Sequence, residues 1–103
     1  MDGHIPVLLN ESISLLEVKN SGIYVDLTFG RGGHSSLLLS KLGEKGKLFA
    51  FDLDKEAIAF GKNKFQDDKR INFIHSSFAF MKEELLEKGV NKVDGIVADL
   101  GVS

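Results

Sequence analysis

A glycine-rich stretch between an apolar run and a leucine-rich run constrains the fold of this 103-residue chain more than any other feature. The apolar residues 23–25 lead into Asp26, three glycines follow at positions 30, 32 and 33, and a leucine-rich run begins beyond them. This pattern predicts a β-strand, a tight turn and the N-terminus of a helix. Glycine lets backbone N–H groups approach a ligand closely, and the helix dipole adds positive potential at the same point. We therefore expect this loop to hold a nucleotide-like cofactor.

The rest of the chain alternates between short apolar runs and amphipathic segments. Strands are predicted at residues 23–27, 47–52, 71–75 and 93–99, and helices at 33–42, 55–65 and 78–88. Asp54 and either Ser76 or Ser77 are the expected caps of the second and third helices. Near-continuous apolar strands that alternate with helices are typical of a parallel sheet covered on both faces. The predicted fold class is therefore α/β, with a Rossmann-like parallel sheet that reaches its fourth strand.

Two expectations concern the ends of the chain. Apolar residues at helical spacing predict a helix from Val7 to Leu16, so we divide the chain into an N-terminal helical segment, 1–21, and the first part of a cofactor-binding domain, 22–103. A doubly wound sheet usually continues past its fourth strand, so we expect the N-terminal portion of a longer protein. The strand at 93–99 would then be an open edge, at which the fragment could pair with a second copy as a homodimer.

Composition narrows the possible functions. The net charge of −2 and the pI near 5.9 show no basic footprint for nucleic acid. Cysteine is absent, which excludes disulfides and thiolate metal sites, and the acidic and histidine residues have no metal-ligand spacing, so no metal is expected. No apolar run approaches the roughly 20 residues that span a bilayer, and the N-terminus lacks the features of a signal peptide. We expect a cytoplasmic protein without membrane contact.

Three carboxylates follow three of the predicted strands: Asp26, Asp52 and Asp99. The carboxyl ends of parallel strands meet at one edge of a sheet, and ligands bind at that edge where the strand order reverses. Asp52 lies 20 residues after Gly32, the spacing at which a carboxylate accepts hydrogen bonds from ribose hydroxyls. The sequence therefore predicts that a nucleoside binds at this edge, with Asp52 on its sugar.

The glycine loop and the acids favour a methyl donor over a dinucleotide. The dinucleotide pattern is incomplete, because Ser35 stands where the third glycine belongs. A pyrophosphate would be repelled by neighbouring carboxylates, whereas the sulfonium of S-adenosylmethionine is cationic and suits an acidic edge. Two alternatives remain open from the residues alone. One is an oxidoreductase domain that uses a nicotinamide dinucleotide, and the other is a non-catalytic nucleotide-binding module.

Four strings carry a resemblance to a known family. They are His-Ile-Pro-Val-Leu-Leu-Asn-Glu (4–11), Gly-Arg-Gly-Gly-His-Ser (30–35), Phe-Asp-Leu-Asp (51–54) and Asp-Leu-Gly-Val-Ser (99–103). In this order they resemble the bacterial 16S ribosomal RNA (cytosine-N4)-methyltransferases over essentially the whole chain. The resemblance implies a class I methyltransferase fold and S-adenosyl-L-methionine as cofactor. It also implies methyl transfer to the exocyclic N4 of a cytidine in 16S rRNA of the small ribosomal subunit.

The resemblance also implies roles for individual residues. Gly32, Gly33 and His34 would hold the methionine part of the cofactor, and Asp52 would bind its ribose. Phe78 would pack beside the adenine, and Asp99 would lie next to the methyl-bearing end. Asp99 is also the candidate catalytic residue, as acceptor of hydrogen bonds from the reacting amino group, with His34 as a weaker candidate. Because the segment is acidic, we expect the RNA to bind through parts of the protein beyond it, and residues 1–103 alone to be inactive.

Overall fold

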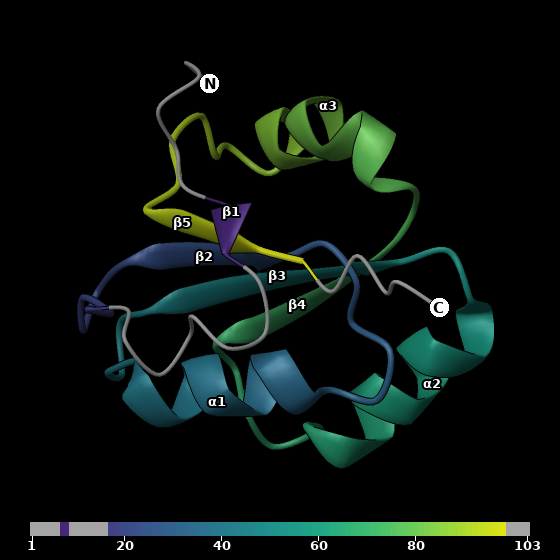
Figure 1. Cartoon of the computed structure of the whole chain (residues 1–103), viewed down its shortest axis with the longest axis horizontal. Coiled ribbons are helices and arrows are strands. Elements are labelled where there is room, and N and C mark those ends of the chain that lie inside the picture. The colour runs from purple at the N-terminus through teal and green to yellow at the C-terminus, as the bar shows by residue number, and fades with distance from the viewer. Residues whose placement is uncertain (1–6, 9–16, 99–103) are drawn as a thin grey trace.

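A computed structural model describes residues 7–8 and 17–98 of the chain. In this part all strand pairs are parallel, and five strands form one sheet in the order β1-β5-β2-β3-β4 (Figure 1). The strands are β1 (Val7–Leu8), β2 (Ile23–Asp26), β3 (Lys47–Asp52), β4 (Ile71–His75) and β5 (Gly95–Val97). The helices are α1 (Gly33–Lys41), α2 (Lys55–Lys64) and α3 (Met81–Glu87), the last preceded by a 3₁₀ turn, Phe78–Phe80. The α/β class predicted from the sequence is confirmed.

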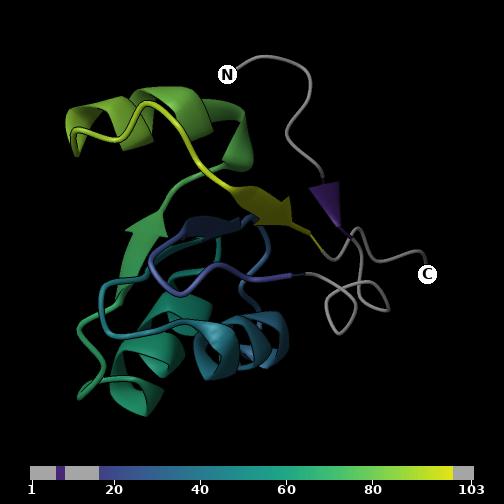
Figure 2. The ribbon, with the colours of Figure 1, turned by 90° about the vertical axis from the view of Figure 1, so that its left-hand side faces the viewer.

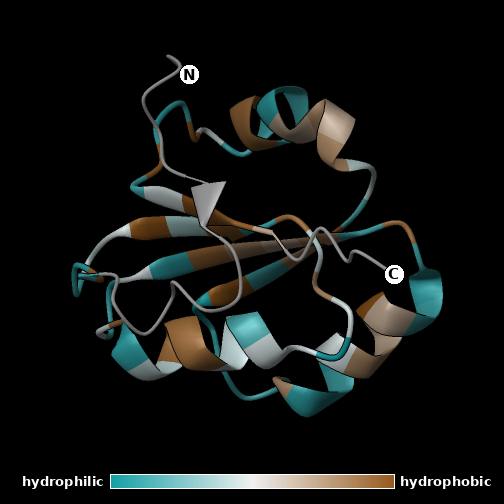
Figure 3. Cartoon of the chain, viewed as in Figure 1, coloured by the Kyte–Doolittle hydropathy of each residue, from teal (hydrophilic) through white to brown (hydrophobic). Residues whose placement is uncertain are grey.

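Helices cover the sheet from both sides, with α1 and α2 on one face and α3 on the other (Figures 1 and 2). Side chains alternate along each strand, so every central strand contributes to two cores. Tyr24 and Leu48 pack with Leu38 of α1, whereas Val25 and Phe49, their neighbours in sequence, belong to the core of Leu85 on α3. The central strands are accordingly rich in hydrophobic residues (Figure 3). No helix in the described ranges has both the length and the hydropathy needed to cross a bilayer.

Local signals in the sequence set the helix ends. Asp54 caps α2 by accepting a hydrogen bond from the Glu56 N–H at 2.9 Å, and Ser77 accepts one from the Ala79 N–H at 3.1 Å. Gly89 follows α3 with a φ of +77°, a conformation that glycine adopts without strain. The predicted helix starts and stops are confirmed to within about a turn. The bounds of β3 and β4 are those expected, and β2 and β5 are shorter than expected.

Two expectations about the ends are wrong. Val7 and Leu8 are not helical, because they form β1, which runs parallel to β5 with Val7 opposite Ile96 and Leu8 opposite Val97. The remainder of the expected helix, 9–16, lies outside the described residues. Strand β5 is consequently paired on both sides, with β1 and with β2, and is not an open edge. Helical spacing is a local signal, and here it is overridden by a long-range pairing that satisfies backbone groups of β5. The basis for pairing two copies through residues 93–99 is thereby removed.

The strand order determines where a ligand can bind. From β2 the chain moves outward to β3 and β4, and it then returns to place β5 on the other side of β2. The strand order therefore reverses beside β2, and ligands of open parallel sheets bind in the crevice at the carboxyl ends of the strands next to such a reversal. The glycine loop leaves β2 at this point.

Candidate functional site

The glycine loop is fastened to the carboxyl end of β3. The Phe29 N–H donates to the Phe51 carbonyl oxygen at 2.9 Å, and the Gly30 N–H donates to Oδ2 of Asp52 at 2.8 Å. The loop then turns through Gly30 and Gly32, whose φ angles of +56° and +88° favour glycine, and Gly32 caps the start of α1. Gly30 and Asp52 are 22 residues apart in the sequence but in contact in the structure. The loop thus lies beside Asp52, as the sequence predicts.

Phe29 anchors the loop in the core, a role that the sequence analysis missed. Its ring is buried and meets Phe73 edge-on at 5.0 Å and Phe65 at 6.1 Å between ring centroids. Gly61 of α2 makes room for it, since a Cβ there would lie 2.7 Å from the Phe29 ring. An aromatic residue inside an otherwise polar glycine loop was the available signal. The anchored ring holds the loop against α2 and leaves Gly30 and Gly33 exposed at the crevice.

Asp52 retains hydrogen-bonding capacity for a ligand. Besides the bond from Gly30, its Oδ1 accepts the Asp54 N–H at 2.9 Å, and the residue is partly exposed at the end of β3. Each carboxylate oxygen has two acceptor positions, so one on each oxygen remains for hydroxyl groups. The two backbone bonds fix the orientation of the carboxylate before a ligand arrives.

Asp26 lies elsewhere than expected. It is completely buried, and it accepts hydrogen bonds from the Ser35 hydroxyl at 2.7 Å and from the Thr28 N–H at 3.0 Å. Burial raises the pKa of the Asp26 carboxyl above its ordinary value, while these two hydrogen bonds and the charge of nearby His34 act in the opposite direction. The expectation that Asp26 lines the crevice beside Asp52 is therefore wrong. The reason is that the first turn of α1 closes over it.

Two hollows open on either side of Arg31. The first has a volume of about 380 Å³ and is lined by Gly30, Arg31, Asp52, Asp54, Glu56, Ala57 and Phe60. The second, of about 460 Å³, is lined by Thr28, Phe29, Gly30, Arg31, Gly33, His34 and Leu37. Three carboxylates face the first hollow against one guanidinium, which itself lies 5.2 Å from the centre of the Phe60 ring. A ligand that spans both hollows would cross the glycine loop and meet net negative charge at one end.

The residues predicted from the resemblance are only partly brought together. Gly33 and His34 line the second hollow and Asp52 the first, while Gly32 is buried behind the loop. Phe78 begins the 3₁₀ turn after β4 and is 55% exposed, and it lines neither hollow. Asp99 lies outside the described residues. In the described part of the chain, no group of three acidic, histidine or cysteine side chains is arranged to hold a metal ion.

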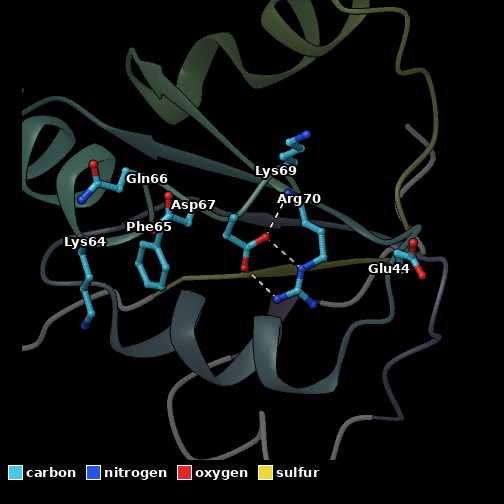
Figure 4. A pocket seen from close by; sticks show the side chains of 8 residues that line it. Glu44, Lys64, Phe65, Gln66, Asp67, Lys69 and Arg70 are labelled. Carbon is cyan, nitrogen blue, oxygen red and sulfur yellow. Dashed lines mark hydrogen bonds and ion pairs between the residues drawn. The ribbon is translucent and has the colours of Figure 1, made fainter.

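A larger hollow, of about 670 Å³, lies at the opposite edge of the sheet (Figure 4). It is lined by Glu44 and by residues 64–70, at the amino ends of β3 and β4. Its arginine is already engaged. The Arg70 guanidinium pairs with Asp68 at 2.7 Å, and its Nη1 donates to two carbonyl oxygens at the end of α1, each at 2.8 Å. Ligands of open parallel sheets bind at the carboxyl ends of the strands, so volume alone does not make this hollow the site.

Relatives of the chain are methyltransferases. Ribosomal RNA small subunit methyltransferase H of Alteromonas mediterranea is 54% identical over 101 residues, which are 97% of this chain and 32% of that protein. The protein of the same name from Neisseria gonorrhoeae is 50% identical over 100 residues, 97% of this chain and 31% of its own length. The chain thus spans about a third of the curated relatives that it matches.

Solved structures share the fold. Fibrillarin of Aeropyrum pernix, determined with bound S-adenosyl-L-methionine, superposes with a TM-score of 0.70 at 20% identity, over 91% of this chain and 43% of that one. An rRNA methylase from Streptococcus thermophilus gives a TM-score of 0.60 at 20% identity, over 72% of this chain and 43% of its own. At this identity the likeness concerns the fold alone. The model of the MraW methylase family, in contrast, matches residues 1–103, and the chain belongs to that family.

Proposed function

We propose that this chain binds S-adenosyl-L-methionine across the glycine loop and forms the cofactor-binding part of a cytoplasmic methyltransferase. The proposed acceptor is the exocyclic N4 of a cytidine in the 16S rRNA of the small ribosomal subunit. Membership of the MraW methylase family and the names of the curated relatives support this assignment. The observation that carries it is the hydrogen bond from Gly30 to Asp52, which holds the acid that we assign to the ribose against the glycine loop at the carboxyl edge of the sheet.

The residues present fit this cofactor. At Gly33 an added Cβ would meet nothing within 4 Å, so the backbone of the loop is open to a ligand. We assign Gly32, Gly33 and His34 to the methionine end, where the positive end of the α1 dipole attracts a carboxylate. Asp52 is assigned to the ribose. Phe78 is assigned to the adenine, because its exposed ring is available for stacking.

Charge at the site favours this cofactor over a dinucleotide. Asp52, Asp54 and Glu56 line the first hollow, and one cation, Arg31, faces them there. A pyrophosphate would meet net repulsion in this place, whereas a cationic sulfonium would be attracted. The acids named here differ from those that the sequence suggested, since Asp26 is buried and Asp54 and Glu56 replace it. The conclusion about ligand charge is the same.

The proposed reaction needs positioning more than acid–base power. S-adenosylmethionine supplies an activated methyl group, and the amino nitrogen of cytosine is a weak nucleophile because its lone pair is delocalised into the ring. The protein therefore has to hold the nitrogen in line with the methyl group. It also has to accept hydrogen bonds from the amino group as positive charge develops on it. We assign the accepting role to Asp99, which is two positions beyond the end of β5 in the sequence, and a secondary role to His34.

Two measurements test the proposal. Isothermal titration of the chain with S-adenosylhomocysteine and, separately, with NAD should give saturable binding for the first alone, and binding of NAD alone would overturn the assignment. The second measurement is transfer of a radiolabelled methyl group to small ribosomal subunits. We expect it for the chain extended to the length of its relatives and not for residues 1–103 alone. An extended protein that binds the cofactor but labels no RNA would instead be a non-catalytic module.

A further inference from the structure

Asp26 and Ser35 form a buried polar pair beneath the glycine loop. Neither side chain is exposed to solvent, and the Ser35 hydroxyl donates to Oδ2 of Asp26 at 2.7 Å. Asp26 is the last residue of β2, and Ser35 lies in the first turn of α1. The other oxygen, Oδ1, accepts the Thr28 N–H at 3.0 Å. One carboxylate therefore binds both the first part of the loop and its far end.

Burying this polar pair in a core costs free energy. A carboxyl group loses its hydration on burial, and an apolar pair of the same size would pack without that cost. The cost is visible in the raised pKa of Asp26, for which desolvation is the largest cause. The position of the pair indicates what the carboxylate provides. The bonds at Phe29 and Gly30 fasten the middle of the loop to β3, and the Asp26–Ser35 bond fastens the beginning of α1 to β2.

The residues enclosed by this bond include those assigned to the methionine end of the cofactor. Gly32 and Gly33 lie between Thr28 and Ser35, and His34 directly precedes Ser35. Gly32 and Gly33 bear no side chain that could fix their conformation, so the loop depends on its attachments for a single shape. A loop held in one conformation before binding loses less conformational entropy when the ligand arrives.

We infer that Asp26 is a positioning residue, which sets cofactor affinity by clamping Thr28 and Ser35 and thereby preorganising residues 28–35, without contact with the ligand. The identity of the ligand in this inference rests on the proposed function, whereas the effect of Asp26 on the conformation of the loop does not. The clamp acts through hydrogen-bond geometry. Asparagine has the same shape, can accept from the Thr28 N–H and can donate to the Ser35 hydroxyl, so it should replace aspartate at this position. Alanine can do neither.

The test compares three variants with a matched control. Asp26→Ala removes both bonds, Ser35→Ala removes one, and Asp26→Asn preserves the shape. Tyr24→Phe is the control, because it also removes a hydrogen bond made by a buried side chain of β2. This bond, which the Tyr24 hydroxyl accepts from the Lys19 N–H at 3.0 Å, is partly buried and lies at the end of the strand away from the loop. Amide hydrogen exchange of the ligand-free chain and calorimetric binding of S-adenosylhomocysteine are measured at a temperature at which each variant is folded.

We expect exchange of the amides in residues 28–36 to rise about tenfold in Asp26→Ala, and affinity for S-adenosylhomocysteine to fall by about tenfold, as for the loss of two hydrogen bonds of modest net strength. Ser35→Ala should show smaller changes of the same kind and serves in place of Asp26→Ala if that variant does not fold. Asp26→Asn should lie within about threefold of the wild type, and Tyr24→Phe should change neither quantity in the loop.

Three results would overturn the inference. The first is loop exchange that does not change in Asp26→Ala or Ser35→Ala. The second is an asparagine variant as weak as the alanine variant, which would mean that charge acts and not anchoring. The third is loosening of the loop without loss of affinity. If the wild-type chain binds no S-adenosylhomocysteine, the proposed function fails, while the exchange data still decide whether Asp26 anchors the loop.

Discussion

Two adjacent glycines in the loop should respond oppositely to the same substitution, alanine for glycine. Gly32 has a φ of +88°, and a Cβ there would lie 3.0 Å from the Phe29 ring and 3.3 Å from the Phe65 ring. Gly33 begins α1 with no positive φ, and a Cβ there would meet nothing within 4 Å. The two glycines are adjacent in the sequence, but in the structure Gly32 lies against aromatic rings and Gly33 faces open space.

The expected magnitudes follow from these contacts. A left-handed conformation costs a residue with a Cβ about 1–2 kcal/mol, and crowding against two packed rings adds about 1 kcal/mol. Gly32→Ala should therefore lower the free energy of unfolding by about 2–3 kcal/mol, a large part of the roughly 5–15 kcal/mol available to a domain of this size. The corresponding drop in Tm is about 10–20 °C. Gly33→Ala should leave stability unchanged or raise it by up to about 0.5 kcal/mol, because alanine favours the helix.

Urea unfolding followed by circular dichroism measures both values, with equal m-values as the sign that the two variants unfold in the same way. The same proteins are then titrated with S-adenosylhomocysteine. Gly33→Ala should bind more weakly than wild type although it is as stable, because its methyl group stands where the ligand meets the backbone. A Gly32→Ala variant within about 0.5 kcal/mol of Gly33→Ala would refute the reasoning.

Four further predictions concern side chains. Because burial raises the pKa of Asp26 above its ordinary value of 3.8, the folded protein holds this proton more tightly than the unfolded chain. The stability of the wild type relative to Asp26→Asn should therefore fall as the pH rises above 3.8, until the native carboxyl is ionised, and parallel urea-unfolding curves across pH would contradict this. Arg70→Met removes the bonds to the last carbonyls of α1 and should cost about 2 kcal/mol in urea unfolding. The hydrogen bond from Arg70 lowers the pKa of Asp68, so the stability lost by this variant should be present above pH 3.8 and should shrink as the pH falls through the lowered pKa. Asp52→Ala should weaken binding of S-adenosylhomocysteine by roughly 10- to 100-fold in calorimetry, and an unchanged Kd would remove Asp52 from the site. Phe78→Ala should change stability by less than about 0.5 kcal/mol, since the ring is 55% exposed, and should weaken binding about fivefold if the ring stacks on adenine.

Much of the fold could be predicted from the sequence because its signals are local. Asp54 and Ser77 cap helices through hydrogen bonds two residues along the chain, and Gly89 ends one by its own φ angle. The apolar runs of β3 and β4 indicate strands by their local composition alone. The proximity of Asp52 to the glycine loop also follows from a general rule, that the carboxyl ends of parallel strands share an edge.

The features that could not be predicted depend on contacts between distant segments. Leu8 fits a helical stripe by spacing, with Val7 at the expected start of that helix. Only the pairing with β5, nearly 90 residues later, makes the two residues a strand. Asp26 resembled the other strand-end acids in sequence, and its burial depends on how α1 lies over the end of β2. The insertion of Phe29 between Phe65 and Phe73 needs the close approach that Gly61 allows.

The central claim is that the cofactor binds at the carboxyl edge of the sheet, on the glycine loop and Asp52. Titration of the isotope-labelled chain with S-adenosylhomocysteine, followed by amide chemical shifts in NMR, tests it directly because the two hollows at the glycine loop and the larger hollow lie at opposite edges of the sheet. We predict that the shifts concentrate at Gly30–His34 and at Asp52–Asp54. Shifts concentrated at Glu44 and at residues 64–70, with the loop unaffected, would contradict it.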